Sequence, residues 1–309
     1  MILLAGIRTE PPLARVAAEL DELNVPVAWF DQRQAAENAC RCRIDADGVR
    51  GTLRLGRQTV RLEDMAAVYT RLMDDRFLPE LRGLPADAPE RAACRRLHDT
   101  LGTWFELAPG RVVNRASAMA SNNSKPYQAQ LIRAVGFDVP ETLVTNEPDL
   151  VRDFLAVHGH VIYKSVSGTR SIVREVDDDA LARLDDIRWC PVQFQAYVEG
   201  VDVRVHVIGR QVFATRISSA AADYRYAAHG GGLPARLEPA RLSELTEQRC
   251  VELTERLGLR FSGIDLRITP AGRAVCFEAN PCPGYTYYEG HTGQPIARAV
   301  ARHLAGLAA

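Results

Sequence analysis

Two short runs near the carboxyl end of the sequence alternate apolar and polar residues and carry two acidic side chains. The runs are residues 261–269 and 273–279. A two-residue turn at Ala271-Gly272 would join them, so the pattern predicts a β-hairpin. The apolar faces of the two strands coincide when Ile268 lies opposite Val275 and Asp265 lies opposite Glu278.

This register gathers the side-chain oxygens of Asp265, Glu278 and Asn280 on one face of the hairpin. Two neighbouring carboxylates repel each other unless a proton or a cation neutralises them. An oxygen-only ligand set suits Mg²⁺, which keeps several waters and shares the phosphate oxygens of a nucleotide. The residues therefore allow two interpretations, a Mg²⁺ site or an ordinary solvated sheet face.

Two lysines stand out in a sequence that is rich in arginine and poor in lysine. Lys125 follows Ser124, a typical helix N-cap, and the N-terminus of a helix attracts anions. Lys164 ends an apolar strand and leads into a loop with Ser167 and Gly168, where small residues let backbone amides approach phosphate oxygens. The alternative is that both are surface lysines without a ligand.

The elements that would position these residues follow from hydrophobic periodicity. The first third of the sequence predicts a strand, a helix and a second strand, followed by a further strand and a charged helix. Together these elements indicate a small parallel sheet. These elements cover residues 2–6, 13–23, 26–30, 66–70 and 87–107. Small, polar and turn-forming residues over 108–124 then indicate a domain boundary.

The rest of the sequence predicts a compact α+β unit, followed by a C-terminal region in which most elements are strands. The unit has helices near 125–135 and 148–157 and strands at 141–145, 161–165 and 171–175. The last part has strands at 192–198, 203–208 and 211–217, a long polar loop at 219–239, a helix at 240–257, the hairpin and a helix at 294–307. We therefore expect an α/β (α+β) protein with domains at 1–115, 116–190 and 191–309.

Composition excludes several classes of protein. The formal net charge is −1, which does not favour nucleic-acid binding. No apolar run approaches the roughly 20 residues that span a bilayer, and the apolar start is too short for a signal peptide. The seven cysteines show neither a disulfide framework nor a zinc spacing. A cytoplasmic protein without a membrane partner is the expectation.

Taken together, the motifs resemble the ATP-grasp superfamily, specifically its RimK-like branch, over about residues 110–309. The resemblance rests on the following segments: Ser124-Lys125-Pro126, Tyr163-Lys164-Ser165, Gln195 to Glu199, Asp202-Val203-Arg204, Asp223-Tyr224-Arg225, Gly263-Ile264-Asp265 and Glu278-Ala279-Asn280. Each segment is short, and the signal lies in the set and its order. The resemblance implies an ATP-grasp fold, in which two lobes close over ATP behind a small parallel-sheet N-terminal domain.

The resemblance also implies roles for individual residues. In the small lobe, Lys125 and Lys164 would contact ATP phosphates together with the loop that holds Ser167 and Gly168. The remaining nucleotide contacts would come from Gln195, from the backbone of Tyr197 and Val198 at the adenine, and from Glu199 or Asp202 at the ribose. Asp265, Glu278 and Asn280 would hold Mg²⁺, and Arg204 and Arg216 would steady the transferred phosphoryl group. One ion or two, and Mn²⁺ in place of Mg²⁺, stay open.

Within this branch the chain is most similar to the ligases that crosslink ribosomally made peptides, the graspetide or microviridin-type synthetases. The implied reaction activates a carboxylate as an acyl phosphate, releases ADP and joins an amine or a hydroxyl. Arg71, Arg225 and His229 are candidate contacts for a peptide or amino-acid substrate. The alternatives are an amino-acid or dipeptide ligase and a non-catalytic ATP-binding regulator, and a homodimer is an open arrangement.

Overall fold

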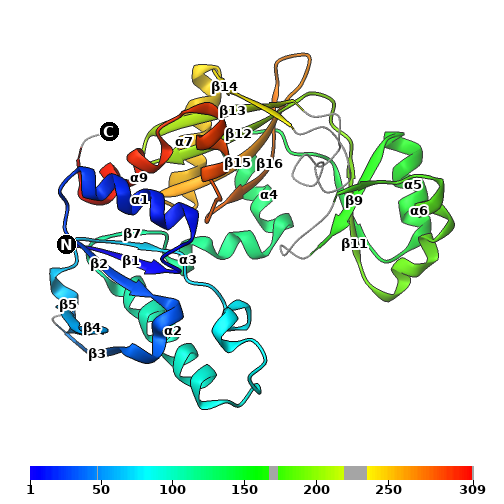
Figure 1. Ribbon diagram of the computed structural model, residues 1–309. Helices are drawn as coiled ribbons and strands as arrows, with labels where there is room; N and C mark the ends of the chain where they lie inside the picture. The colour runs from blue at the N-terminus through cyan, green and yellow to red at the C-terminus, as the bar shows by residue number, and fades with distance from the viewer. Residues whose placement is uncertain (47, 167–172, 219–234, 308–309) are drawn as a thin grey trace.

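The computed structural model describes residues 1–46, 48–166, 173–218 and 235–307 (Figure 1). These residues form a parallel sheet at the N-terminal end, a small three-stranded sheet beside it, and two further sheets that carry the candidate site. The expected α/β (α+β) class is confirmed. No helix in the described ranges is both long and apolar enough to cross a membrane.

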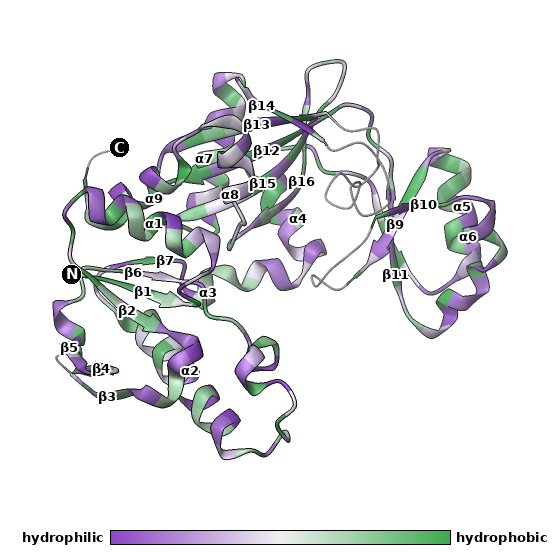
Figure 2. Ribbon diagram, viewed as in Figure 1, coloured by the Kyte–Doolittle hydropathy of each residue, from purple (hydrophilic) through white to green (hydrophobic). Residues whose placement is uncertain are grey.

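The N-terminal sheet is parallel, with strand order β2-β1-β6-β7. Its strands are β1 (Ile2–Gly6), β2 (Val27–Asp31), β6 (Ala67–Thr70) and β7 (Arg111–Val113). All five residues of β1 are buried, because α1 (Pro11–Glu22) and α2 (Pro89–Leu107) cover opposite faces of the sheet. The expected strand–helix–strand opening is therefore confirmed, and Figure 2 shows β1 and β2 as largely hydrophobic strands.

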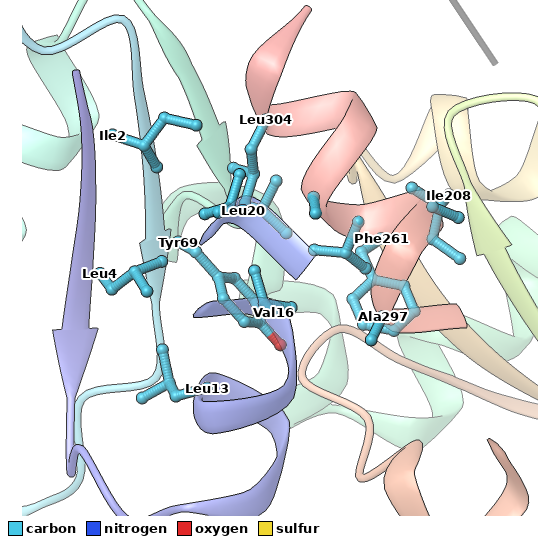
Figure 3. Close-up of a cluster of buried hydrophobic side chains, with 14 of the residues drawn as sticks. Ile2, Leu4, Leu13, Val16, Leu20, Tyr69, Ile208, Phe261, Ala297 and Leu304 are labelled. Atoms are coloured by element: carbon cyan, nitrogen blue, oxygen red, sulfur yellow. The ribbon is translucent and has the colours of Figure 1, made fainter. Parts of the chain in front are cut away.

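One apolar cluster joins this sheet to the C-terminal end of the chain. Figure 3 shows Leu20 of α1 between Tyr69 of the parallel sheet and Leu304 of α9 (Ile296–Ala305), with Val16 of α1 beside the Tyr69 ring. Phe261 belongs to the same cluster and lies at the start of the predicted hairpin. Because this core is continuous, the parallel sheet holds one end of the hairpin in place.

A three-stranded antiparallel sheet follows β2, and the hydrophobic pattern did not predict it. Its strands are β3 (Asn38–Asp45), β4 (Gly48–Leu55) and β5 (Gln58–Arg61), in the order β3-β4-β5. Only Leu53, Leu55 and Val60 are buried in these strands. Arginine occupies five of the ten positions of the other face, and several apolar positions of the inner face are only partly buried or are exposed, which weakened the apolar alternation on which the prediction depended.

The small lobe has a four-stranded antiparallel sheet with the order β10-β9-β11-β8. Its elements are β8 (Thr142–Thr145), α5 (Pro148–His158), β9 (Val161–Ser165), β10 (Arg174–Glu175), α6 (Asp178–Ala182) and β11 (Val192–Ala196). Figure 1 shows α5 and α6 on the outer side of this sheet, so the opposite face turns toward the rest of the molecule. Ser167 and Gly168 lie outside the described residues.

The large lobe has a five-stranded antiparallel sheet with the order β14-β13-β12-β15-β16. Its elements are β12 (Val201–Ile208), β13 (Gln211–Ser218), β14 (Arg236–Ala240), α7 (Glu244–Arg256), β15 (Phe261–Ile268), β16 (Ala274–Asn280), α8 (Thr286–Thr292) and α9. The polar loop expected at 219–239 is wrong for its last residues, because Arg236–Ala240 pairs with β13. Arg225 and His229 lie outside the described residues.

The helices between the first two domains pack differently from expectation. These are α3 (Ala116–Met119) and α4 (Lys125–Ala134). Ile132 of α4 shares a buried cluster with strands of the five-stranded sheet, and Ala118 and Met119 of α3 pack against it. Residues 116–134 therefore lie with the large lobe, although the expected small lobe began at 116. Short 3₁₀ turns complete the described chain at 32–37, 62–64, 75–77, 79–81, 120–123 and 184–189.

Candidate functional site

The β15–β16 hairpin brings the three oxygen-bearing residues together. Asp265 lies directly opposite Glu278, as the register predicted, and Gly263 lies opposite Asn280. Because directly opposite residues share a face of an antiparallel sheet, all three side-chain oxygens project from the same face. The end of the hairpin nearest the site therefore follows the prediction.

The turn end of the hairpin differs from the prediction by one residue. Ile268 lies opposite Ala274, not opposite Val275, and the register shifts at Leu266. The shift is a β-bulge that leaves Phe277 as the extra residue. It turns the Phe277 ring toward the guanidinium of Arg267, whose Cζ lies 5.4 Å from the ring centre.

Each carboxylate of the hairpin already faces a basic side chain. The Arg204 Nη1 donates to Asp265 Oδ1 at 2.6 Å, and Lys125 Nζ lies 3.9 Å from Glu278 Oε2. These cations offset the repulsion that two adjacent carboxylates would otherwise suffer. The Arg204 side chain is 7% exposed, so this positive charge is held at the base of the site.

Helix α4 supplies Lys125 and also fixes the strand that carries Glu278. The Ser124 hydroxyl caps the helix by accepting from the Tyr127 N–H at 3.4 Å, which places Lys125 in the first turn. One turn later the buried Gln128 amide accepts from the Ala279 N–H and donates to the Ala279 carbonyl, both at 3.0 Å. The two bonds fix the residue between Glu278 and Asn280.

A second buried amide, that of Asn114, fixes the open end of the hairpin, where β15 begins and β16 ends. The Asn114 amide donates to the carbonyls of Phe261 and Pro281 at 2.6 Å each, and its oxygen accepts from the Arg260 N–H at 2.8 Å. Asn114 follows β7, so it joins the N-terminal sheet to the hairpin. Neither Asn114 nor Gln128 was singled out from the sequence, because a single amide in a helix or loop carries no recognisable motif.

Gly263 is required by the close packing of Arg204. A Cβ at this glycine would lie 2.2 Å from Arg204 Nη2 and 2.7 Å from the Cβ of Pro283. No side chain fits beside the guanidinium, so the glycine lets Arg204 reach Asp265. Arg204 also lies over the ring of Tyr288, with Cζ 5.7 Å from the ring centre.

The small-lobe sheet presents a polar row on its inner face. Gln193 lies directly opposite Lys164 on β9, and Gln195 lies opposite Ile162. The alternate residues Tyr163 and Phe194 pack into the small-lobe core. Lys164, Gln193 and Gln195 are all at least nine-tenths buried, and they project from the face that turns toward the large lobe. Within the described residues, the Oε1 atoms of both glutamines have no hydrogen-bond partner.

The hinge segment, residues 197–200, connects the two lobes and is fastened by one arginine. Arg267 donates to the Val198 carbonyl at 2.8 Å and to both oxygens of Asp202, at 2.7 and 3.0 Å. Its Cζ lies 5.3 Å from the centre of the Tyr197 ring. Asp202 is therefore held by an arginine, whereas Glu199 is exposed.

Comparison with known proteins places the chain in a family. Residues 122–304 match the family model of the RimK-like ATP-grasp domain. The chain belongs to the RimK-like ATP-grasp family. It is 27% identical to a probable alpha-L-glutamate ligase of Stenotrophomonas maltophilia (strain K279a), over 88% of this chain and 96% of the relative.

Two solved structures with a similar fold are described as ATP-grasp ligases. A ligase associated with ribosomally made peptides from Chryseobacterium gregarium, in complex with ADP and a leader and core peptide, has a TM-score of 0.84 at 22% identity and covers 100% of this chain and 97% of its own. The ATP-grasp ligase PsnB complexed with its minimal precursor has a TM-score of 0.79 at 26% identity, with 99% and 98% covered. Both comparisons cover the N-terminal sheet as well as the ATP-grasp domain.

The sheet register contradicts the role expected for Arg216 in this ATP-grasp domain. Arg216 lies opposite Val203, whereas Arg204 lies opposite Thr215 on the neighbouring row. Arg216 therefore projects from the face opposite to Arg204, where it lines a groove of about 870 Å³ with Glu238 and Arg241. The expectation failed because the motif fixed only the residue type and not which side of the strand it occupies.

The donor set of the ATP-grasp hairpin fits Mg²⁺. Asp265, Glu278 and Asn280 provide only oxygen ligands, and their Arg204 and Lys125 partners leave the site close to neutral. Among the described residues, no three His, Cys, Asp or Glu side chains cluster as metal ligands. The Asn280 amide offers a third oxygen on the same face, and this oxygen accepts from the Cys282 N–H at 2.9 Å.

Burial shifts one titratable group behind the site. His206 follows Arg204 on the same face of β12 and packs against Tyr288, with ring centres 5.0 Å apart. Complete burial, and then the positive charge of Arg204, lower the pKa of His206 well below 6.5. The imidazole is therefore neutral, and it adds no positive charge to the site.

Proposed function

We propose that this RimK-like chain is an ATP-dependent ligase that activates a carboxylate as an acyl phosphate and modifies a peptide. An oxygen of the substrate carboxylate attacks the γ-phosphorus of ATP, and ADP leaves. An amine or a hydroxyl then attacks the acyl carbon, and phosphate leaves. The observation that carries the proposal is the opposed pair Asp265–Glu278, with Arg204 and Lys125 beside it.

The chain contributes alignment and positive charge to this reaction. We assign Lys125 and Lys164, the only two lysines of the sequence, to the ATP phosphates. Arg204 would offset charge on the transferred phosphoryl group. Asp265, Glu278 and Asn280 would hold Mg²⁺, which supplies charge neutralisation to the phosphates when bound.

The adenosine would lie between the inner face of the small-lobe sheet and the hinge segment. The Tyr197 N–H already donates to the His160 carbonyl at 2.9 Å, which leaves the Tyr197 carbonyl and the Val198 N–H for the adenine edge. Gln195 offers an amide oxygen on the same side. We assign the ribose to Glu199, because Asp202 is engaged by Arg267.

The substrate carboxylate would approach from the N-terminal sheet. Arg71 follows β6, donates to Glu10 at 2.8 Å and to the Pro283 carbonyl at 3.2 Å, and so reaches the loop directly after the Mg²⁺ ligands. A guanidinium in this position could bind the carboxylate that is activated. Arg225 and His229 keep their predicted substrate roles, as do Ser167 and Gly168 for phosphate.

A peptide substrate is supported by the peptide-bound complexes of the structural relatives. The names of the sequence relatives favour a second candidate, a ligase that adds glutamate. Mn²⁺ in place of Mg²⁺, a second ion, a homodimer and a cytoplasmic location stay predictions.

The test compares Glu278→Gln with Glu252→Gln, an exposed control on α7. ADP release is measured with acidic peptides and with a panel of free amino acids. We expect Glu278→Gln to abolish ADP release with every acceptor, because an amide lacks the charge that holds Mg²⁺, and the control to retain it. Normal ADP release from Glu278→Gln would contradict the metal role.

The acceptor panel separates the candidate functions. ADP release with acidic peptides alone would support peptide modification, whereas release with free glutamate alone would support the second candidate. Tight ATP binding without turnover on any acceptor would instead support a non-catalytic ATP-binding regulator.

A further inference from the structure

The three-stranded sheet β3-β4-β5 has one face on which half of the residues are arginine. Arg43 lies directly opposite Arg50, and Thr52 lies between Arg41 on β3 and Arg61 on β5. Arg54 lies between Ala39 and Thr59 on the same side. Because directly opposite residues share a face, five arginines project together. We call this the arginine face: Arg41, Arg43, Arg50, Arg54 and Arg61.

The arginine face is turned to solvent. The opposite face carries Leu53, Leu55 and Val60, which are buried in the cluster that also contains Trp104 of α2. All five arginines are exposed, and the Arg43 side chain is 85% exposed. The inner face thus supplies the apolar packing of this sheet. Of the five arginines, Arg54 also donates to the Glu37 carbonyl at 2.7 Å.

The charge of this sheet is unbalanced. Residues 38–61 hold six arginines and two aspartates, a net charge of +4 in a chain whose net charge is −1. Acidic neighbours offset only part of the excess, with Arg43 3.6 Å from Asp45 and Arg61 3.4 Å from Glu63. Arg41 forms no ion pair with any residue that the structure describes.

One pair of arginines makes the sheet less stable than it could be. Arg43 and Arg50 are direct cross-strand neighbours, and like charges in that position are destabilising. The Asp45 carboxylate, 3.6 Å from Arg43, offsets part of this repulsion. A sheet that carries this repulsion on an exposed face has the charge pattern of a binding surface for an anion.

We propose that the arginine face is a docking surface for an acidic segment of the peptide substrate. Guanidinium groups bind carboxylates through paired hydrogen bonds, and alternate residues of a strand match alternate side chains of an extended peptide. Residues 38–61 contain no aromatic side chain, so base stacking is not offered to single-stranded nucleic acid. The inference rests on the proposed peptide-modifying function.

The position of the arginine face assigns it to a part of the peptide that does not react. Its sheet packs on the α2 side of the parallel sheet, whereas the cluster with α9 and Phe261 lies on the other side. Figure 1 shows β3–β5 at the end of the molecule away from β15 and β16. Binding there would raise the local concentration of the reacting segment without entering the site.

The experiment uses a labelled peptide that alternates glutamate and glycine, with oligo-dT as the second probe. The variant Arg41→Glu/Arg43→Glu/Arg50→Glu is compared with Arg152→Glu/Arg188→Glu/Arg210→Glu, three exposed arginines outside the sheet. We expect peptide binding by the wild type that weakens with salt. The first variant should bind at least about tenfold more weakly, because each exposed ion pair contributes up to about 1 kcal/mol, and the control variant should stay close to the wild type.

A single variant separates docking from folding. Arg43→Gln removes one of the two facing charges and also the exposed contact with Asp45, which are small effects of opposite sign. Its melting temperature should therefore stay close to that of the wild type while its peptide affinity falls. ADP release with a small acceptor at saturation should not change, which keeps this inference separate from the ligase activity. Equal peptide binding by the triple variant and its control, or binding of oligo-dT in preference to the peptide, would overturn the proposal.

Discussion

The two hydrogen bonds between the Gln128 side-chain amide and the Ala279 backbone form what we call the amide clamp. This clamp gives the sharpest test of how the metal ligands are positioned. The change Gln128→Leu keeps most of the side-chain volume and removes both hydrogen bonds to Ala279, each of 3.0 Å. Ala279 is fully buried, so its N–H and carbonyl would face an apolar side chain. Leaving a buried polar group unsatisfied costs about 1–3 kcal/mol, so the two groups together predict a loss of about 2–6 kcal/mol.

The functional effect should exceed the loss of stability. Ala279 stands between Glu278 and Asn280, so a shift of this residue changes the spacing of two Mg²⁺ ligands. We expect the Mg²⁺ concentration for half-maximal ADP release to rise at least about tenfold, as misplaced ligands lose affinity. The melting temperature should fall by about 4–12 °C, because a chain of this size loses about 2 °C per kcal/mol.

Two variants make the result interpretable. Gln248→Leu removes an exposed glutamine of α7 that donates only to Glu244, and it should change neither quantity. Gln128→Glu keeps the acceptor for the Ala279 N–H and should lie between the wild type and the leucine variant. A Gln128→Leu protein with the melting temperature and Mg²⁺ dependence of the wild type would refute the clamp.

Three further predictions concern Arg204, Arg267 and His206. Gly263→Ala should displace Arg204, lower kcat more than tenfold and cost about 1–3 kcal/mol of stability. The control is Gly102→Ala in α2, where a Cβ meets open space, and it should leave steady-state rates unchanged. Arg267→Gln frees Asp202 and the Val198 carbonyl, so KM for ATP should rise about tenfold with a smaller change in kcat; an unchanged KM would exclude the hinge role. Burial lowers the pKa of His206 in the folded protein well below the 6.5 of the unfolded chain. The free energy of unfolding should therefore fall by up to about 1.4 kcal/mol per pH unit below pH 6.5. Denaturant unfolding of His206→Leu should lack this contribution, and an identical pH dependence of the unfolding free energy in both proteins would count against it.

The sequence predicted the parts of the fold in which one face of an element is uniformly apolar. Ile264 and Ala279 alternate with Asp265 and Glu278, and the structure pairs them in the predicted register. The small-lobe elements follow the same logic, since Tyr163 and Phe194 mark its buried face. Local periodicity suffices wherever burial on one side decides the register.

The remaining differences come from tertiary contacts that periodicity does not encode. The bulge at Phe277 depends on contact with Arg267, and the side of β13 that Arg216 occupies depends on where β12 pairs. Gln128 and Asn114 were missed because their partners are backbone atoms more than a hundred residues away. Gln193 could have been found, since glutamine alternates with apolar residues along β11 beside Gln195.

Both connections of the small lobe are attached to the same hairpin. The Asp138 carbonyl on the first connection accepts from the Cys276 N–H at 2.8 Å. On the second, Gly200 packs so closely that a Cβ would lie 2.3 Å from the Ile268 carbonyl oxygen. A rotation of the small lobe that changes its grip on a nucleotide therefore pulls directly on the strands that carry Asp265 and Glu278, which couples occupancy of one lobe to the geometry of the other.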